Sequence, residues 1–204
     1  MDAKKKRQRL RREELKRKIL AAAGELFAQE GYANFSMRRL AAKIGYSPTT
    51  IYLHFRGKDD LLFSICEELY GVFLHRMAET RASRADLLDV LRRSLHSYIE
   101  IGLANPEHYK TVFFTSPVVY GPPDEFMNRD TQHRRAYRAF SEMVGECMES
   151  GLLRPMDLET LVVVLWSAVH GLVTTIIYSG DFLGADTAAM ADSLVEGLLR
   201  GYAA

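Results

Sequence analysis

The residues from Ser36 to Phe55 constrain the fold most, because they predict two short helices joined by a tight turn. Ser36 offers an N-cap for the first helix, and apolar residues then follow at helical spacing. Gly45 can adopt the left-handed conformation that ends a helix. Ser47 and Pro48 begin a second helix at once, since serine caps helices and proline is tolerated at the first helical position. We expect this second helix to run to Phe55 and to form a helix-turn-helix with the first.

The two faces of the second helix differ in chemistry. Ile51 and Phe55 are four residues apart and are expected to face inward, whereas hydroxyls and rings remain outside. A reader of the DNA major groove needs this division, because its first residues meet base edges and its polar side chains meet phosphates. The candidate DNA-contacting residues border this outer surface: Ser36, Arg38, Tyr46, Ser47, Pro48, Thr49, Thr50, Tyr52, His54 and Lys58. The alternative is a helical hairpin inside an all-helical core, which has no need of these side chains.

Charge is distributed unevenly along the chain. Residues 1–60 hold 15 Lys and Arg against 7 Asp and Glu, a net of +8, whereas the whole chain carries only +1, which leaves −7 for the remainder. A basic DNA reader joined to an acidic body has this layout. The first 18 residues alone hold ten Lys and Arg. They are either a solvated helix start or an arm that adds phosphate or minor-groove contacts, and both alternatives stay open.

The stretch from Ile19 to Leu62 resembles the DNA-binding domain of TetR-family transcriptional repressors. The resemblance rests on these residues: Ile19, Ala22, Ala23, Leu26, Phe27, Gly31, Tyr32, Ser36, Met37, Leu40, Ala41, Gly45, Ser47, Tyr52, His54, Phe55, Lys58 and Leu61. It implies that Tyr52, His54 and Lys58 contact DNA phosphates, and that Lys58 opens the helix leading to a ligand domain. Two positions depart from the family pattern. Tyr46 stands where the family usually has a small aliphatic residue, and Leu53 stands where it often has an aromatic residue.

In the rest of the chain, apolar residues recur at helical spacing almost without interruption. Helices are expected over Leu61 to Met77, Leu87 to Ile99, Pro106 to Phe114, Glu125 to Ser150, a segment that begins at Asp157, and Thr187 to Leu199, with a loop over Thr115 to Asp124. The predicted fold is all-α. It comprises a basic arm (1–13), a three-helix helix-turn-helix domain (14–60) and a helical ligand-sensing and dimerisation domain (61–204).

The segment from Leu161 to Tyr178 is almost uniformly hydrophobic, and its length is at the lower limit for a membrane span. We reject a span because His170 and several hydroxyl residues interrupt the segment and no basic loop flanks it. A helix that is apolar on all sides can equally be covered by its own core and by a partner subunit. The TetR resemblance implies that the last two long helices of each subunit form a four-helix dimer interface, so we expect a cytoplasmic homodimer.

A ligand site is expected in the acidic body. Trp166, His170 and Gly171 resemble the Trp-x-x-x-His-Gly signature of one class of TetR-type C-terminal domains. The pair is either a buried tryptophan with a hydrogen-bonded core histidine or a ligand-contacting pair. Aromatic side chains from separate helices are the usual lining of an apolar pocket, although the same residues would also serve as plain core. The candidate ligand-binding residues are Tyr98, Phe113, Tyr137, Phe140, Trp166 and His170.

Signatures of catalysis are absent from the sequence. It has no glycine-rich phosphate loop, nucleophile elbow or histidine pair at metal spacing, so we expect no enzyme activity, metal or cofactor. Cys66 and Cys147 are far apart in the sequence and lack the spacing of a metal site or of a disulfide framework. They are either two ordinary buried cysteines or a thiol switch.

The sequence predicts a transcriptional repressor that binds double-stranded operator DNA and leaves it when a small apolar effector binds. The rival classes are a DNA-binding protein without an effector and a helical enzyme or carrier.

Overall fold

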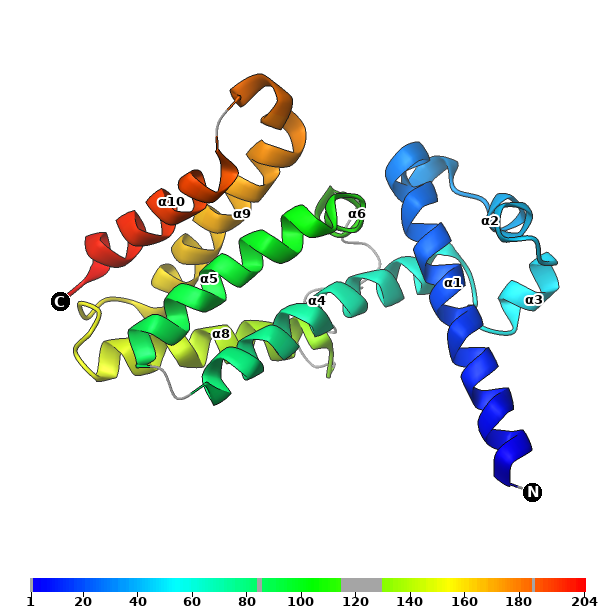
Figure 1. Cartoon of the computed structure of the whole chain (residues 1–204), viewed down its shortest axis with the longest axis horizontal. Helices are drawn as coiled ribbons and strands as arrows, with labels where there is room; N and C mark the ends of the chain where they lie inside the picture. Colours follow the sequence, from blue (N-terminus) through cyan, green and yellow to red (C-terminus); the bar gives the residue numbers. More distant parts are fainter. Residues whose placement is uncertain (1, 84–85, 115–129, 185) are drawn as a thin grey trace. The chain divides into compact units, whose positions relative to one another are not determined.

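The computed structural model describes residues 2–83, 86–114, 130–184 and 186–204. These ranges are helical apart from short connections, which confirms the predicted all-α class (Figure 1). The helices are α1 (Asp2–Asn34), α2 (Met37–Ile44), α3 (Pro48–Tyr52), α4 (Lys58–Ala82), α5 (Leu87–Ala104), α6 (Pro106–Phe114), α8 (Gln132–Glu149), α9 (Leu158–Leu183) and α10 (Thr187–Tyr202). The loop predicted over residues 115–124 lies outside the described residues.

The chain divides into two compact units. The first comprises Met1–Leu69 and Glu107–Arg129, and the second comprises Tyr70–Pro106 and Asp130–Ala204. The first unit therefore holds α1, α2, α3, the beginning of α4 and nearly all of α6. The second holds the remainder of α4 with α5, α8, α9 and α10. Helix α4 thus belongs to both.

The first unit buries one apolar face of α1 against the helix-turn-helix. Its largest buried side chains include Ile19, Phe27, Leu40, Ile51 and Phe55. The basic residues near the start are continuous with α1 and form its first turns. Helix α6 packs closely on α1 at Gly24, where a Cβ atom would lie 3.0 Å from Nε2 of His108. A larger residue at this position would therefore displace the His108 side chain.

The second unit is built around α5, which packs against α8, α9 and α10. Each of these four helices has a side-chain cap at its N-terminus, given by Asp86, Thr131, Asp157 and Asp186. The predicted start of α8 at Glu125 lies outside the described residues, but a helix that runs unbroken from there is wrong, because Asp130 and Thr131 are not helical and the Thr131 side chain caps α8 by accepting the Arg134 amide. Its predicted end is confirmed.

Helix α9 carries many more apolar side chains than the second unit buries. The segment Leu158–Gly180 is long and apolar enough to cross a membrane by length and composition, and only 28% of it is buried inside the chain. Val163, Trp166 and Tyr178 are among its exposed large side chains. The helix therefore presents an apolar face that its own unit leaves open.

Candidate DNA-binding surface and ligand cavity

The turn between α2 and α3 is fixed by local chemistry. Gly45 adopts a left-handed conformation (φ 74°) and its amide bonds back to the last turn of α2, as its position predicted. Ser36 occupies the N-cap position, but the predicted side-chain cap is not formed. The Ser36 backbone carbonyl accepts the Leu40 amide at 3.0 Å, so the first turn closes through the main chain alone.

Helix α3 begins as predicted and ends early. The Ser47 hydroxyl accepts the Thr50 amide at 3.2 Å and shares a 2.9 Å hydrogen bond with the Thr50 hydroxyl. The helix stops at Tyr52, so His54 and Phe55 lie beyond it and the predicted extension to Phe55 is wrong. The amides of both bond to the Ile51 carbonyl, and this tight turn brings Phe55 into the core at 2% exposure.

The outer surface of the helix-turn-helix carries the predicted hydroxyls and rings. Tyr46 and Tyr52 are 43% and 54% exposed, and Thr49 is also exposed, whereas Ile51 and Phe55 are buried. The predicted division into an inner and an outer face is confirmed. Arg38 is exposed on α2, and Ser36, Pro48, Thr50, His54 and Lys58 are partly buried. The sequence-predicted residues thus lie on one short stretch of α2, α3 and the start of α4.

Lys58 opens α4 as predicted, and its side chain is held by the protein. Its Nζ lies 4.1 Å from the centroid of the Tyr32 ring and 3.5 Å from the Tyr32 carbonyl oxygen. The Tyr32 hydroxyl hydrogen-bonds to Asp59, and this bond raises the pKa of Tyr32 to about 12. The ammonium group is therefore positioned by an aromatic ring at the first turn of the helix.

Cationic side chains of α1 lie beside the same surface. The sequence did not predict their positions. Lys18 donates to the Ile44 carbonyl at 3.2 Å and lies over the Tyr46 ring, and Lys16 lies over the Phe55 ring. The pKa of His54 is lowered by burial and then by the charges of Arg12 and Lys16. The basic composition of the first 18 residues was the only signal for this arrangement in the sequence.

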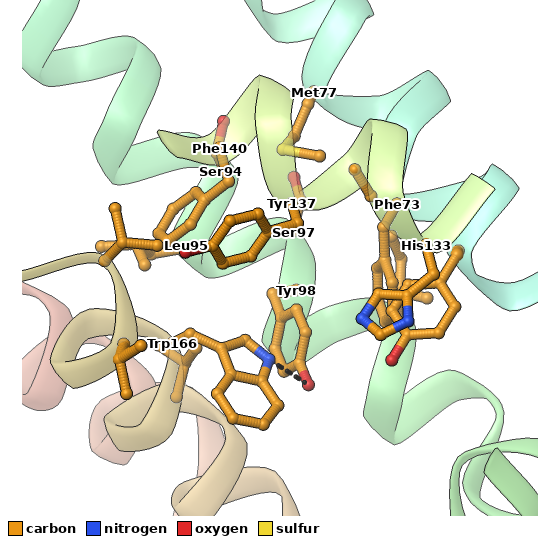
Figure 2. Close-up of a pocket in the computed structure, with 16 residues that line it drawn as sticks. Phe73, Met77, Ser94, Leu95, Ser97, Tyr98, His133, Tyr137, Phe140 and Trp166 are labelled. Atoms are coloured by element: carbon orange, nitrogen blue, oxygen red, sulfur yellow. Dashed lines mark hydrogen bonds between the residues drawn. The ribbon is translucent and has the colours of Figure 1, made fainter. Parts of the chain in front are cut away.

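The second unit contains a cavity of about 220 Å³ between α4, α5, α8 and α9. Figure 2 shows side chains from these helices disposed around it. Its aromatic lining consists of Tyr70, Phe73, Tyr98, Tyr137, Phe140 and Trp166. Aliphatic side chains, two serines and His133 complete the wall. A cavity with this lining is suited to an apolar molecule.

A hydrogen-bonded cluster holds one wall of the cavity. Trp166 Nε1 donates to the Tyr98 hydroxyl at 3.2 Å, and the same hydroxyl lies 3.1 Å from Nδ1 of His170 (Figure 2 shows the first bond). The rings of Trp166 and His170 stack with centroids 4.9 Å apart. Trp166 is 37% exposed, so it is not the buried core tryptophan of one sequence interpretation. His170 is hydrogen-bonded as that interpretation expected, and burial lowers its pKa.

The structure brings together four of the six predicted ligand residues: Tyr98, Tyr137, Phe140 and Trp166. His170 is not among the lining residues and acts on the wall through Tyr98. The prediction that Phe113 lines the cavity is corrected: Phe113 is not among the lining residues. It lies on α6 in the first unit, and its ring centroid is 4.5 Å from that of Tyr109.

Sequence reasoning missed Tyr70, Phe73 and His133. His133 stacks on Tyr70 at 4.1 Å, and burial lowers its pKa to about 4. The sequence did offer a signal for His133: it is three, four and seven residues before Ala136, Tyr137 and Phe140, which places all four on one face of a helix.

A short capped helix that exposes hydroxyls and rings beside cationic side chains is the arrangement by which helix-turn-helix proteins bind DNA. The fold therefore places the chain in the class of helix-turn-helix proteins. Two sequence-family models match it: "Bacterial regulatory proteins, tetR family" over residues 19–65, and "Tetracyclin repressor-like, C-terminal domain" over residues 91–198. The chain belongs to the TetR family and is a DNA-binding regulator of transcription.

Relatives agree with this assignment along most of the chain. The fatty acid metabolism regulator protein of Bacillus subtilis (strain 168) is 24% identical over 185 residues, which cover 90% of this chain and 93% of the relative. A TetR-family transcription regulator from Marinobacter aquaeolei VT8 has a similar structure (TM-score 0.76, 22% identity, 96% of this chain and 98% of that one). So does the regulator FadR from Bacillus subtilis in complex with stearoyl-CoA (TM-score 0.74, 20% identity, 90% and 97%). These structures show the shared fold.

Proposed function

We propose that the chain is a homodimeric, cytoplasmic repressor that leaves its operator when a small apolar molecule occupies the cavity of the second unit. The observation that carries this proposal is an aromatic-lined cavity of about 220 Å³ in a chain whose other unit is a helix-turn-helix. The precedent of a similar regulator in complex with stearoyl-CoA supports a small-molecule ligand for this chain. The ligand shifts the population toward a form that binds DNA poorly, so ligand and operator weaken each other's binding.

The operator surface is proposed to combine two kinds of contact. Tyr46, Thr49 and Thr50 lie at the start of α3 or just before it and face base edges. Phosphate contacts come from a larger set of polar and cationic residues: Ser36, Arg38, Ser47, Tyr52, His54 and Lys58. Pro48 has no donor, so it touches the DNA only by van der Waals contact. Support for this division is the exposure of Tyr46, Thr49 and Tyr52 and the cationic side chains of α1 beside them. The first turns of α1 add phosphate contacts of their own.

The dimer is proposed to form through α9 and α10. An open groove runs along these helices, with Leu172, Met190, Leu194 and Leu198 in its lining. A second subunit that covers this groove would also cover apolar surface of α9, which explains its hydropathy without a bilayer. The division of labour then follows the proposed domains, with DNA binding up to about residue 60 and ligand sensing and dimerisation after it.

The second unit is further proposed to be of the Trp-x-x-x-His-Gly type. The signature positions Trp166 and His170 stack on each other and both hydrogen-bond to Tyr98. One face of this cluster is the cavity wall. The signature would therefore serve ligand sensing by fixing the position of an aromatic wall.

Binding to the intergenic DNA upstream of the chain's own gene tests the operator surface, with Lys58→Ala as the variant. Lys58 is held at the start of α4 by Tyr32, so its loss should weaken binding about equally on all sequences. The slope of log K against log salt should fall by roughly 0.9, the value of one phosphate contact. Fluorescence anisotropy at several salt concentrations measures both quantities.

Arg93→Ala is the matched control, because it removes the same charge from an exposed position on α5, outside both the proposed operator surface and the proposed dimer interface. It should leave the salt slope unchanged. A Lys58→Ala protein with altered base preference and an unchanged slope would contradict the assigned role. Operator binding that no small molecule weakens would favour the rival class, a DNA-binding protein without an effector.

A further inference from the structure

We infer that the ligand of the second-unit cavity is a compact, uncharged aromatic molecule of one or two rings that carries a hydrogen-bonding group, and not a long-chain acyl thioester. The inference rests on the proposed function, which takes the cavity as the effector site, and it names the chemical class of that effector. Three properties of the cavity support this ligand class independently: the charge of its lining, its volume and the chemistry of its wall.

The described residues of the wall offer no partner for a charged group. Among the described residues that line the cavity, none is Lys, Arg, Asp or Glu. Within this described lining, His133 is the side chain that could become a cation near neutral pH, and burial lowers its pKa to about 4, so it is uncharged there. A carboxylate or phosphate buried without a cation is strongly disfavoured, and phosphates are usually bound by Arg or Lys. The cavity therefore selects an uncharged molecule.

The volume limits the size of that molecule. The cavity measures about 220 Å³. An apolar cavity of ~150 Å³ holds one benzene, and pockets for drug-sized ligands span roughly 300–1,000 Å³. One or two rings fit between these limits, whereas a long acyl chain does not. The relative solved with stearoyl-CoA thus shares the fold but is expected to differ in ligand.

Aromatic rings approach the cavity from all four of its helices, which favours a flat ligand over an aliphatic one. Figure 2 shows Tyr137 and Phe140 on one side and Trp166 on another, with Tyr98 near them. The bonds from Trp166 and His170 to the Tyr98 hydroxyl hold that ring in place, and Phe73 stacks on it at 4.7 Å. Fixed rings give a flat aromatic molecule stacked and edge-to-face contacts without reordering the wall.

The polar groups of the wall are neutral. Ser94 and Ser97 carry hydroxyls at the cavity, and Tyr137 adds a phenol. The Ser94 hydroxyl donates its proton to the Val90 carbonyl at 2.8 Å, so its oxygen can only accept from a ligand. A hydroxyl can donate or accept a hydrogen bond, so it suits a phenol, an amide or an indole nitrogen on the ligand. The position of that group would decide the ligand's orientation among the rings.

Isothermal titration calorimetry on the full-length protein tests the inference with three probes. 2-Naphthol is compact, aromatic and uncharged at pH 7.5. 2-Naphthoate has the same rings and a negative charge, and stearoyl-CoA is the long acyl thioester. We expect 2-naphthol to bind with one molecule per chain, 2-naphthoate to bind at least tenfold more weakly, and stearoyl-CoA to give no saturable binding.

Two variants locate the binding. Ala136→Phe fills the cavity from α8, and Ser97→Leu narrows it from α5, so each should reduce 2-naphthol affinity at least tenfold. Ala139→Phe is the matched control, because Ala139 lies on α8 outside the lining and is only partly buried. Circular dichroism and operator binding show that each variant is folded. If Ala136→Phe does not fold, Ser97→Leu carries the test.

Several results would overturn the inference. They are no binding of 2-naphthol, equal or tighter binding of 2-naphthoate, saturable binding of stearoyl-CoA that the folded cavity variants abolish, and 2-naphthol binding that those variants leave intact. Operator release is measured separately by anisotropy. Binding of 2-naphthol without release would contradict the proposed function and leave the ligand class standing. Release by stearoyl-CoA alone would support the proposed function and refute the ligand class.

Discussion

Replacing His133 with phenylalanine should remove a pH dependence from the stability of the second unit. The imidazole is stacked on Tyr70 at 4.1 Å, and burial lowers its pKa to about 4. In the unfolded chain the pKa returns to about 6.5. Below that pH the unfolded chain binds a proton that the folded chain does not bind, so the free energy of unfolding falls as the pH falls.

The size of the effect follows from the two pKa values. With about 6.5 unfolded and about 4 folded, linkage gives a loss of about 2 kcal/mol between pH 7 and pH 5. The ring keeps some contact with solvent, which screens part of the penalty. We therefore expect a loss of about 1–2 kcal/mol in the wild type that the variant does not show.

Urea unfolding at pH 7 and pH 5 measures this loss, with the fluorescence of Trp166 as the signal. This residue is the only tryptophan of the chain and lies in the second unit, so it reports on that unit. His133→Phe keeps a ring against Tyr70 but cannot titrate. The other histidines contribute equally to both proteins and cancel in the difference. A wild-type-minus-variant difference that is the same at both pH values would refute the reasoning.

Two further predictions concern specificity and assembly. Thr50→Val keeps a methyl group at the start of α3 and removes the hydroxyl, so it should cost about 1–3 kcal/mol at one operator position, measured by competition with single-base variants. Equal losses on operator and random DNA would place Thr50 at a phosphate. Leu194→Asp puts a charge in the α9–α10 groove and should give folded monomers with poor operator affinity in sedimentation velocity. A fully buried neighbour such as Val195 would test folding instead, and a Leu194→Asp protein that stays dimeric would contradict the proposed interface.

The turn of the helix-turn-helix could be predicted because its causes are local. Gly45 ends α2 and Ser47 with Pro48 begins α3 through bonds within a few residues of each other. The end of α3 could not be predicted in this way. Phe55 lies beyond the end of α3 although its amide still bonds to the Ile51 carbonyl and its ring is buried, so the spacing of Ile51 and Phe55 predicts their common face but not the end of the helix.

The cavity could be predicted only as a set of chemical types. Tyr98 and Phe113 are both aromatic residues on amphipathic helices, and nothing in their spacing tells which helices share a core. Asn105 and Pro106 break the chain between them, and α6 then joins the first unit. The exposure of Trp166 likewise depends on which helices pack around α9, which periodicity does not encode.

One helix belongs to both units, and this bears on how a ligand could change DNA binding. Over its 25 residues α4 is roughly 37 Å long. Leu61 and Ile65 are buried near its start in the first unit, whereas Phe73 and Met77 line the cavity in the second. Successive turns of a helix are joined by main-chain hydrogen bonds, so a rotation at Phe73 bears on the turns that carry Leu61. Occupancy of the cavity would therefore reach the helix-turn-helix along the main chain of α4.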